Sequence, residues 1–310
     1  MLDLRQIQYF ISLYEERSVT RAAQRLNVVQ PALSMQISRL QKRLGITLFE
    51  RTARGMIPTS AGEAMYRIYL PILLDLRHAN QRVMELGGKV LGKFAVGIIP
   101  SITNSVLADV LRHFSVKYPD VEIRIDEAYS GTLIDWVMAG DLDFAIINAT
   151  PRRRPGTSVI PLINEELVLV ESKGRGGNTA PVRFQSLRDF LLVLPSRRHG
   201  LRTIVEEAAE NAGIEITPQI EVDALSPTLR LVSESELATV LPSIVARKSA
   251  TELPLQTRRI IAPALQRQLV CVHRTEQPLS QIVQVFLDEL KQELHRGMPP
   301  SLPRKARRKP

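Results

Sequence analysis

The apolar and polar positions between residues 18 and 54 predict two short helices joined by a tight connection. Ser18 is a good N-cap, and alanine and leucine residues recur behind it at helical spacing. The second helix is expected to begin near Gln30, with Pro31 in its first turn, and to end at Gly45. Its core stripe is expected to comprise Leu33, Ile37, Leu40 and Leu44. The pattern predicts a helix-turn-helix, although a solvated helical hairpin would show the same amphipathic pair.

A basic ribbon follows this helix pair and favours the first interpretation. A β-type run at residues 47–49, a basic turn at 50–55 and a return run at 56–57 predict a wing. A winged helix-turn-helix can place its second helix in a major groove of DNA while basic wing residues contact phosphates or the minor groove. The candidate DNA-binding residues are Gln30, Pro31, Ser34, Met35, Ser38, Lys42, Arg51 and Arg54.

A long helix is predicted to follow the wing, opened by a capping box at residues 60–63. Seven residues along it are spaced alternately by four and three positions, which is the heptad seam of a coiled coil. Pro71 falls inside the helix, and Gly87 is expected to end it. The seam predicts a homodimer, and two reading heads should bind an interrupted inverted repeat in double-stranded DNA. The candidate dimerisation residues are Met65, Tyr69, Ile72, Leu76, Ala79, Val83 and Leu86.

After residue 90, apolar runs alternate with helical segments, which predicts an α/β domain with a mostly parallel sheet. In the first half we expect strands at 94–99, 121–127 and 144–147 and helices at 105–118 and 133–139. In the second half we expect strands at 167–170, 190–194, 219–222 and 238–241 and helices at 201–212 and 228–235. Two similar α/β lobes suggest a cleft between them.

The net charge of +9 is concentrated at the two ends of the chain. Residues 1–60 contribute +5, residues 301–310 contribute another +5, and the 240 residues between them sum to −1. A near-neutral body with basic ends favours a localised nucleic-acid-binding surface. The tail at 297–310 is poor in apolar residues, so we expect it to be disordered. It serves either as a solubilising terminus or as a non-specific DNA contact.

The composition is that of a soluble globular protein, with 44% hydrophobic and 24% charged residues. The single cysteine, Cys271, allows no internal disulfide and is expected to be a buried structural thiol. No signal peptide and no membrane-spanning run is evident. We therefore expect a cytoplasmic, nucleoid-associated protein.

An enzyme built on the two-lobed domain is a rival hypothesis, but the sequence offers it no support. It contains no G-x-S-x-G, P-loop, H-E-x-x-H or C-x-x-C motif. The five histidines show no metal-ligand spacing. We therefore expect no catalytic residues, no metal site and no cofactor.

Four motifs in the first 88 residues resemble those of the LysR-type transcriptional regulators. They are Gln30-Pro31-Ala32-Leu33-Ser34, Leu44-Gly45, Leu48-Phe49-Glu50-Arg51 and Thr59-Ser60-Ala61-Gly62. The resemblance is strong over residues 3–88 and looser to about residue 295. It implies a winged helix-turn-helix, a long dimerising linker helix, and an effector domain similar to the two-lobed periplasmic solute-binding proteins. It further implies four subunits. The expected domains are 1–59 for DNA binding, 60–88 for the linker helix, 89–296 for effector binding and 297–310 for the tail.

The resemblance also implies that effector contacts fall on polar segments that follow predicted strands, where open α/β sheets bind ligands. Segment 100–103 opens a helix, and its hydroxyl and N–H groups could hold a carboxylate or another anion, although plain N-capping explains it equally well. Basic residues in segment 195–202 favour an anionic effector, with surface solvation as the alternative. The candidate effector-binding residues are Ser101, Thr103, Thr132, Asn148, His199 and Arg202.

One segment departs from the family pattern. LysR-type regulators usually have a glycine-containing turn where this chain has Ser235, Glu236 and Leu237. We expect the fold to tolerate this change, but the effector response is transferred less safely. The sequence therefore predicts a DNA-binding transcriptional regulator whose DNA binding or bending responds to a small anionic effector. The alternative is an effector-independent regulator with a vestigial cleft.

Overall fold

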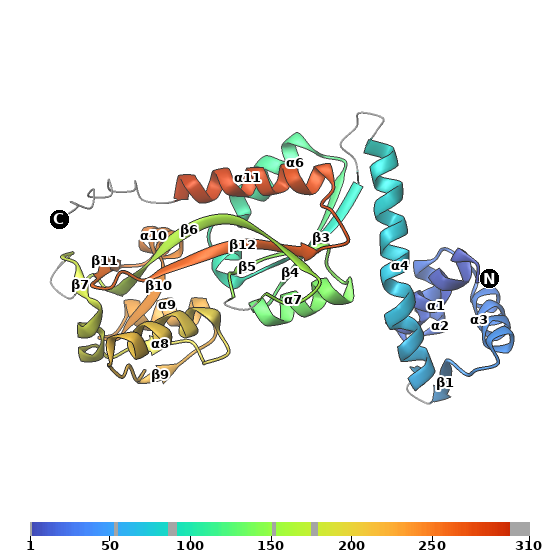
Figure 1. Ribbon diagram of the computed structural model, residues 1–310, viewed down its shortest axis with the longest axis horizontal. Coiled ribbons are helices and arrows are strands. Elements are labelled where there is room, and N and C mark those ends of the chain that lie inside the picture. Colours follow the sequence, from blue (N-terminus) through green and yellow to red (C-terminus); the bar gives the residue numbers. More distant parts are fainter. Residues whose placement is uncertain (1, 53–54, 86–91, 151–152, 175–178, 298–310) are drawn as a thin grey trace. The chain divides into compact units, whose positions relative to one another are not determined.

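The computed structural model describes residues 2–52, 55–85, 92–150, 153–174 and 179–297. The chain folds as two compact units, residues 1–89 and 90–310 (Figure 1). Among the described residues, no helix combines the length and the apolar character needed to cross a bilayer.

The N-terminal unit is a helix-turn-helix with a wing, as predicted. Its elements are α1 (Leu4–Glu16), α2 (Val19–Arg25), α3 (Gln30–Leu44), β1 (Phe49–Thr52), β2 (Gly55–Pro58) and α4 (Ser60–Glu85). The Oγ of Ser18 accepts a hydrogen bond from the N–H of Arg21 and so caps α2. Asn27 adopts a left-handed φ of 52° between α2 and α3, and Gly45 with φ 70° ends α3. Sequence-local signals therefore set the boundaries of both reading helices.

Three details of this unit differ from the expectation. The first strand of the wing begins at Phe49, so Glu50, Arg51 and Thr52 belong to β1 and not to the turn. Leu44 is 37% exposed because α3 extends beyond the core that its earlier leucines fill. The long helix is capped by Thr59, whose Oγ1 accepts from the N–H of Gly62 at 3.1 Å, and not by a box that starts at residue 60.

The C-terminal unit is built on an eight-stranded sheet. Its elements are β3 (Gly92–Ile98), α5 (Pro100–Thr103), α6 (Leu107–Lys117), β4 (Val121–Glu127), α7 (Ser130–Ala139), β5 (Phe144–Asn148), β6 (Thr157–Ser172), β7 (Val182–Arg183), η1 (Phe184–Asp189), β8 (Val193–Leu194), α8 (Gly200–Ala212), β9 (Ile220–Glu221), α9 (Leu225–Ser233), β10 (Ala238–Pro242), α10 (Ser243–Glu252), β11 (Leu255–Ile261), β12 (Gln266–Arg274) and α11 (Gln281–Gly297). The strand order is β4-β3-β5-β12-β6-β11-β7, with β10 also paired to β6.

The prediction of a mostly parallel sheet is wrong, because the sheet is mixed. β3 pairs in parallel with β4 and β5, but β12 is antiparallel to both β5 and β6, and β10 and β11 are antiparallel to β6. The long strand β6 was expected only at 167–170. Its polar stretch Asn164-Glu165-Glu166 interrupts the apolar run by which a buried strand is recognised.

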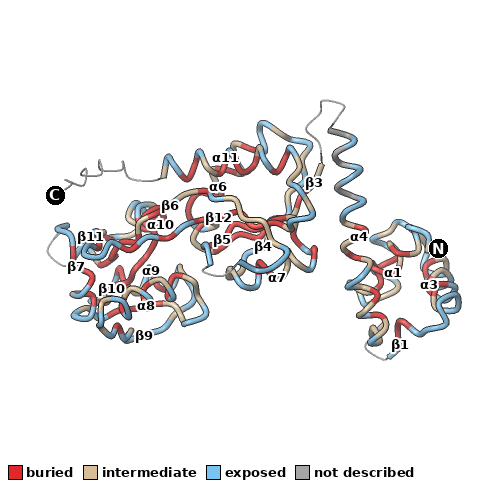
Figure 2. Tube along the Cα trace, in the orientation of Figure 1, coloured by how far each residue is buried: buried red, intermediate tan, exposed pale blue. Residues whose placement is uncertain are grey.

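Two separate cores confirm the two-lobed α/β architecture. The first-lobe core gathers side chains from β3, β5, α6 and α11, whereas the second-lobe core gathers those from η1, β8, α8 and β10. β6 passes through both, since Val168 faces the first core and Leu167 the second. In Figure 1, α6 and α11 lie side by side on the first lobe, and Figure 2 shows buried residues concentrated along the strands.

The segment that lacks the family's glycine forms a turn without one. α9 ends at Ser233, and the Oγ of Ser235 donates to the carbonyl of Leu231 at 2.6 Å while accepting from the N–H of Leu237 at 3.2 Å. Among the described residues, no position between 234 and 237 has a positive φ. A serine side chain therefore closes the turn, and no left-handed residue is needed there.

Candidate DNA-reading face and effector site

The predicted DNA contacts that the structure describes are all exposed residues of the N-terminal unit. On α3 they recur at intervals of three and four residues, which places them on one helix face. The exposed candidates are Gln30, Pro31, Ser34, Met35, Ser38 and Lys42 on α3 and Arg51 on β1. Arg54 lies outside the described residues. The arrangement leaves polar side chains of α3 and the arginine of β1 exposed to a nucleic acid.

Hydrogen bonds fix α3 relative to its neighbours in this unit. The Oε1 of Gln30 accepts from the Oγ1 of Thr20 at 3.3 Å, which leaves the amide N–H groups of Gln30 to donate outward. The Oε1 of Gln41 accepts from the backbone N–H groups of Leu48 at 2.7 Å and Phe49 at 3.1 Å. The start of the wing is therefore tied to α3 by a single side chain.

Gly55 opens the return strand of the wing, and no other residue would fit there. Its φ is 114°, and a Cβ built on it would lie 2.5 Å from the carbonyl oxygen of Arg17. That carbonyl also accepts the N–H of Met56 at 3.0 Å. The wing is thus held against the end of α1 by a close backbone approach that requires glycine.

Two exposed residues of the helix-turn-helix, Val29 and Arg39, were not among the predicted DNA contacts. Val29 is the N-cap residue of α3, yet it makes no side-chain capping bond and is 69% exposed. Arg39 is exposed on α3 beside Ser38. An aliphatic side chain at an N-cap is disfavoured, so the cap position itself was a signal that could have identified Val29.

The predicted dimer seam on α4 divides into two parts. Met65 is 6% exposed and Tyr69 packs against the core of the N-terminal unit, so both serve this chain's own fold. Further along, the helix exposes a row of apolar side chains. They are Ile68 (60% exposed), Ile72 (51%), Leu76 (38%) and Val83 (67%), with Ala79 also exposed. Leu86 lies outside the described residues. The exposed row begins at Ile68, which is not part of the predicted seam.

In the C-terminal unit, Arg267 of β12 joins two predicted effector residues. Its Nη1 donates to the Oγ of Ser101 at 2.7 Å and to the Oδ1 of Asn148 at 3.2 Å. Its Nε and Nη2 donate to the Oε2 of Glu165 at 2.9 and 2.7 Å. The Oε1 of Glu165 accepts from the backbone N–H of Ile244 at 2.7 Å. Arg267 thus ties the ends of two first-lobe elements, α5 and β5, to β6.

This arrangement fixes what Ser101 and Asn148 can offer a ligand. Because Arg267 donates to both side-chain oxygens, the Ser101 hydroxyl hydrogen and the Asn148 amide N–H groups remain available as donors. Neither group has another protein partner among the described residues, and the Nδ2 of Asn148 is not sealed from solvent. Two donors on side chains held by the same arginine favour a ligand that presents hydrogen-bond acceptors.

The second lobe meets this cluster through His199 and Gly200. A Cβ on Gly200 would lie 3.3 Å from the Nδ2 of Asn148, so the start of α8 approaches the end of β5 closely. The Nδ1 of His199 accepts from the N–H of Leu201 at 3.1 Å, which caps α8 and puts the proton of the neutral ring on Nε2. Burial lowers the pKa of His199 below 6.5, Arg267 lowers it further, and Asp223 opposes the shift. His199 is therefore a neutral donor near pH 7.

Tyr129 is a second link between the lobes. Its ring meets that of His199 edge to face at a centroid distance of 5.1 Å, and its hydroxyl donates to the carbonyl of Asp223 at 3.3 Å. Burial raises the pKa of Tyr129, and the carboxylates of Asp223 and Glu127 add to the shift. Asp223 is held in turn by the N–H and hydroxyl of Ser196 at 2.8 and 2.9 Å.

The remaining candidates do not join this cluster by a direct contact. The Thr103 hydroxyl bonds to the carbonyl of Pro100 and to Glu127. Thr132 is exposed in the first turn of α7 and has no hydrogen-bond partner in the described part of the chain. Arg202 is buried, but it pairs with Glu206 at 2.9 Å and Glu221 at 3.4 Å within its own lobe.

Sequence reasoning missed Arg267, Glu165 and Tyr129. Arg267 occupies a buried position of a strand whose buried residues are mostly apolar, and it lies 102 residues from Glu165. A charged residue in such a position was a signal of a buried pair, but its partner could not be identified without the sheet order.

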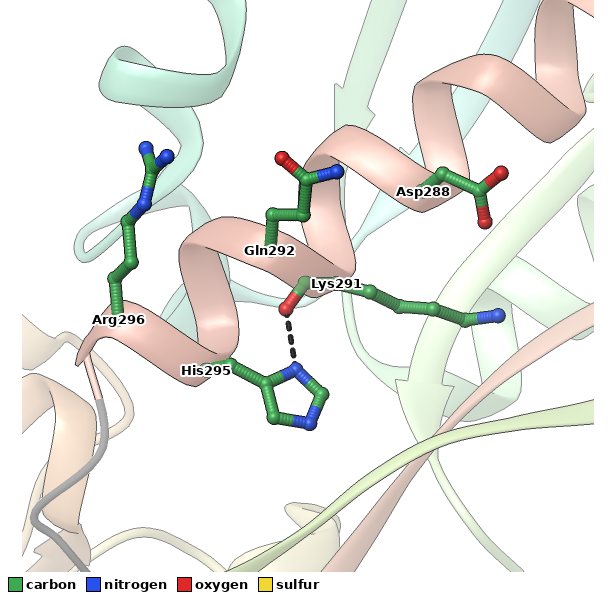
Figure 3. Close-up of a pocket in the computed structure, with 5 residues that line it drawn as sticks. All are labelled: Asp288, Lys291, Gln292, His295 and Arg296. Atoms are coloured by element: carbon green, nitrogen blue, oxygen red, sulfur yellow. Dashed lines mark hydrogen bonds between the residues drawn. The ribbon is translucent and has the colours of Figure 1, made fainter.

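A shallow hollow along the outer side of α11 shares no residue with this cluster. It is lined by Asp288, Lys291, Gln292, His295 and Arg296, all from one helix and carrying charges of both signs (Figure 3). Nothing from a second element converges on it, so we do not assign the effector to it.

Comparisons with known proteins identify the family of both units. Residues 87–295 match the LysR substrate binding domain, and residues 4–63 match the bacterial regulatory helix-turn-helix of the lysR family. The chain is 28% identical over 271 residues to the nitrogen assimilation regulatory protein nac of Klebsiella aerogenes, covering 86% of this chain and 87% of that protein. It is 30% identical over 277 residues to a probable hydrogen peroxide-inducible genes activator of Streptomyces viridosporus, covering 88% of each.

Solved structures have the same fold over nearly the whole chain. A full-length OxyR variant from Pseudomonas aeruginosa has a TM-score of 0.75 at 25% identity and covers 94% of this chain and 95% of its own. Full-length CbnR in complex with its target DNA has a TM-score of 0.65 at 22% identity, with coverages of 94% and 100%. This chain therefore belongs to the LysR family of bacterial transcriptional regulators, which bind DNA, carry an effector-binding domain and are not enzymes.

Proposed function

We propose that this regulator reads DNA with the exposed face of α3 and the basic wing, and that an anionic small molecule at the Arg267 cluster changes its DNA binding or bending. In this proposal residues 1–59 bind DNA, 60–88 form the linker helix and 89–296 bind the effector. The tail at 297–310 adds non-specific DNA affinity; apart from Gly297, which ends α11, it lies outside the described residues. The match to a substrate binding domain favours this reading over an effector-independent regulator.

The observation that carries the effector proposal is the double hydrogen bond from Arg267 to Ser101 and Asn148. It leaves the two side chains as paired donors, and His199 supplies a third N–H in its neutral form. A carboxylate offers two acceptor oxygens and is held most strongly by several converging donors. The charge of Arg267 is already balanced by Glu165, so in this proposal neutral hydrogen-bond donors rather than a free cation hold the anion.

Peroxide, which the names of several relatives mention, is not the signal that we propose for this chain. Its single cysteine, Cys271, is fully buried on β12, and burial raises the pKa of its thiol to about 12. Only the thiolate reacts readily, so this thiol is inert at neutral pH.

The proposed assembly is a homodimer formed through α4, which pairs further into a tetramer. Its support is the row of exposed apolar residues that begins at Ile68. Two reading heads related by a twofold axis would recognise an interrupted inverted repeat. We place this assembly in the cytoplasm, on the nucleoid.

The test is DNA binding by the full-length protein to its own upstream region, with and without a panel of small carboxylates and their neutral amides. We expect one carboxylate to shift the affinity or the DNA bend, and its amide to have no effect. Ser101→Ala and Asn148→Asp should abolish the response while leaving effector-free DNA binding unchanged. Asn148→Asp is decisive because it keeps the acceptor for Arg267 and replaces the free donor by a second acceptor. Arg112→Ala, a change at a residue of α6 that is 66% exposed, is the control.

A response to neutral or cationic compounds alone would contradict the anionic effector. A full response in both Ser101→Ala and Asn148→Asp would place the effector elsewhere. Selective DNA binding that is indifferent to the whole panel would favour the effector-independent alternative.

A further inference from the structure

Away from the effector cluster, three metal-binding side chains meet between α6 and α11 of the first lobe. His113 comes from α6, and Glu289 and Glu293 come from α11. The Nδ1 of His113 lies 3.1 Å from the Oε1 of Glu293 and 3.9 Å from the Oε1 of Glu289. One ligand atom from each of the three residues lies within 4.8 Å of the other two.

These distances match the spacing of donors around a small metal ion. Zinc binds histidine nitrogen and carboxylate oxygen at about 2.0–2.1 Å, so adjacent donors of a tetrahedron are about 3.3 Å apart. The two distances from His113 lie on either side of that value. Glu289 and Glu293 are four residues apart on a helix, so both carboxylates project from the same face toward α6.

The charge of the cluster also favours a cation. The side chains of Glu293 and Glu289 are 9% and 15% exposed, and the helix segment that carries them packs on the first-lobe core through Phe286, Leu290 and Leu294. Two neighbouring carboxylates in such a position need positive charge close by. Among the described residues, Glu289 has an ion pair only with His113.

Arg296 occupies part of the space that a metal would use. Its Nη1 lies 2.5 Å from the Oε1 of Glu293, but its side chain is 63% exposed and sits at the end of α11. Figure 3 shows the side chain extended on the side of the helix opposite His295. An exposed arginine can rotate into solvent at little cost, so it acts as a replaceable counter-charge.

We propose that His113, Glu289 and Glu293 bind a divalent first-row transition metal ion, for which Zn²⁺ is the probe, in competition with Arg296. Three protein ligands leave a fourth position for water. The imidazole ligand selects transition metals over Mg²⁺ and Ca²⁺, which prefer oxygen donors. The bound ion would bridge the neighbouring helices α6 and α11 of the first lobe. The spacing of the histidines could not reveal this site, because His113 and Glu293 are 180 positions apart in sequence.

The experiment is calorimetric titration of the full-length, untagged, chelator-treated protein with Zn²⁺ in a buffer that contains millimolar Mg²⁺. We expect one equivalent to bind. His113→Ala and Glu293→Gln should each weaken binding at least tenfold. Arg296→Ala should strengthen it severalfold, because the competing cation is removed. His295→Ala is the matched control: this exposed histidine lies on the same helix, and its Nδ1 bonds to the carbonyl of Lys291 at 2.6 Å (Figure 3).

A measurement on the unaltered protein guards against variants that misfold. Co²⁺ should give a visible absorption spectrum with a nitrogen and oxygen ligand set, and Zn²⁺ should displace it. Absence of a saturable one-equivalent signal, or weaker binding by Arg296→Ala, would overturn the proposal and leave the three residues as an ion-pair network. Equal losses from His113→Ala and His295→Ala would assign the metal to surface histidines instead.

Discussion

Arg267 and Glu165 form an ion pair of 2.7 Å in which each side chain is only 1% exposed. Breaking such a pair by neutralising one member leaves the other charge buried without compensation, which costs about 3–5 kcal/mol. We therefore expect Glu165→Gln to lower the free energy of unfolding of the C-terminal unit by about that amount. Urea denaturation followed by the fluorescence of Trp136, the single tryptophan of the chain, measures it in this unit.

The control for this prediction is a double-mutant cycle with Arg267→Met. The double variant should cost clearly less than the sum of the two single changes, because no unpaired charge remains. Additive losses, or a cost of Glu165→Gln below about 1 kcal/mol, would mean that water or another group compensates the guanidinium.

His199 should make the stability of the same unit depend on pH. Burial lowers the pKa of His199 below its ordinary value of 6.5, so the unfolded chain binds the proton more readily than the folded one. The contribution of neutral His199 to the free energy of unfolding is therefore fully present above pH 6.5. It is lost as the pH falls toward the folded-state pKa of His199. We expect urea midpoints to decline from pH 7.5 to 5.5.

His199→Asn is the comparison for the pH effect. Asparagine also caps helices and does not titrate, so the variant should keep α8 intact and show a smaller decline over the same range. An equal decline in both proteins would assign the pH dependence to other groups.

Substitutions in the DNA-reading face should separate specificity from affinity. Gln30→Ala removes a side chain whose free amide donors face outward, and it should cost about 1–3 kcal/mol at the preferred site with little loss on random DNA. Arg51→Ala should weaken binding to both and reduce the salt slope by about 0.9, the value for one phosphate contact. Fluorescence anisotropy at several salt concentrations distinguishes the two patterns.

Arg112→Ala serves as the control for charge alone. This arginine is 66% exposed on α6 of the C-terminal unit and pairs with Asp109. It should leave both affinities unchanged. If Gln30→Ala and Arg51→Ala lowered the two affinities in equal proportion, the division into base-reading and phosphate-contacting residues would be wrong.

Features set by interactions between residues close in sequence were predicted correctly, whereas features set by distant segments were not. The caps at Ser18 and Gly45 and the left-handed turn at Asn27 are local, and they place α2 and α3 without further information. The partners of β6 and β12 come from distant segments, so neither the antiparallel pairing nor the contact of Arg267 with Asn148 could be read from neighbours in sequence. Periodicity also predicts that a side chain is packed, but it does not identify the element or the second chain against which the side chain packs.

The exposed row on α4 is a case in which periodicity predicts packing but does not identify the packing partner. Met65 continues the heptad pattern but is buried in its own unit, whereas Ile68 and Ile72 are 60% and 51% exposed. A row of four large aliphatic side chains on one helix is unusual on a monomer and favours a coiled-coil partner. Ile72→Asp should place a charge in that contact and release monomers in analytical ultracentrifugation at micromolar concentration.

Arg67→Asp provides the control for that change, since Arg67 is exposed on α4 outside the row. It introduces the same aspartate on the same helix, with a larger change in charge than Ile72→Asp, and should leave the assembly intact. Because two reading heads are required for an inverted repeat, Ile72→Asp should also lose affinity for a two-half-site operator while keeping the affinity for a single half-site. An Ile72→Asp protein that stays dimeric would show that α4 does not carry the contact, and the exposed row would then need a different partner.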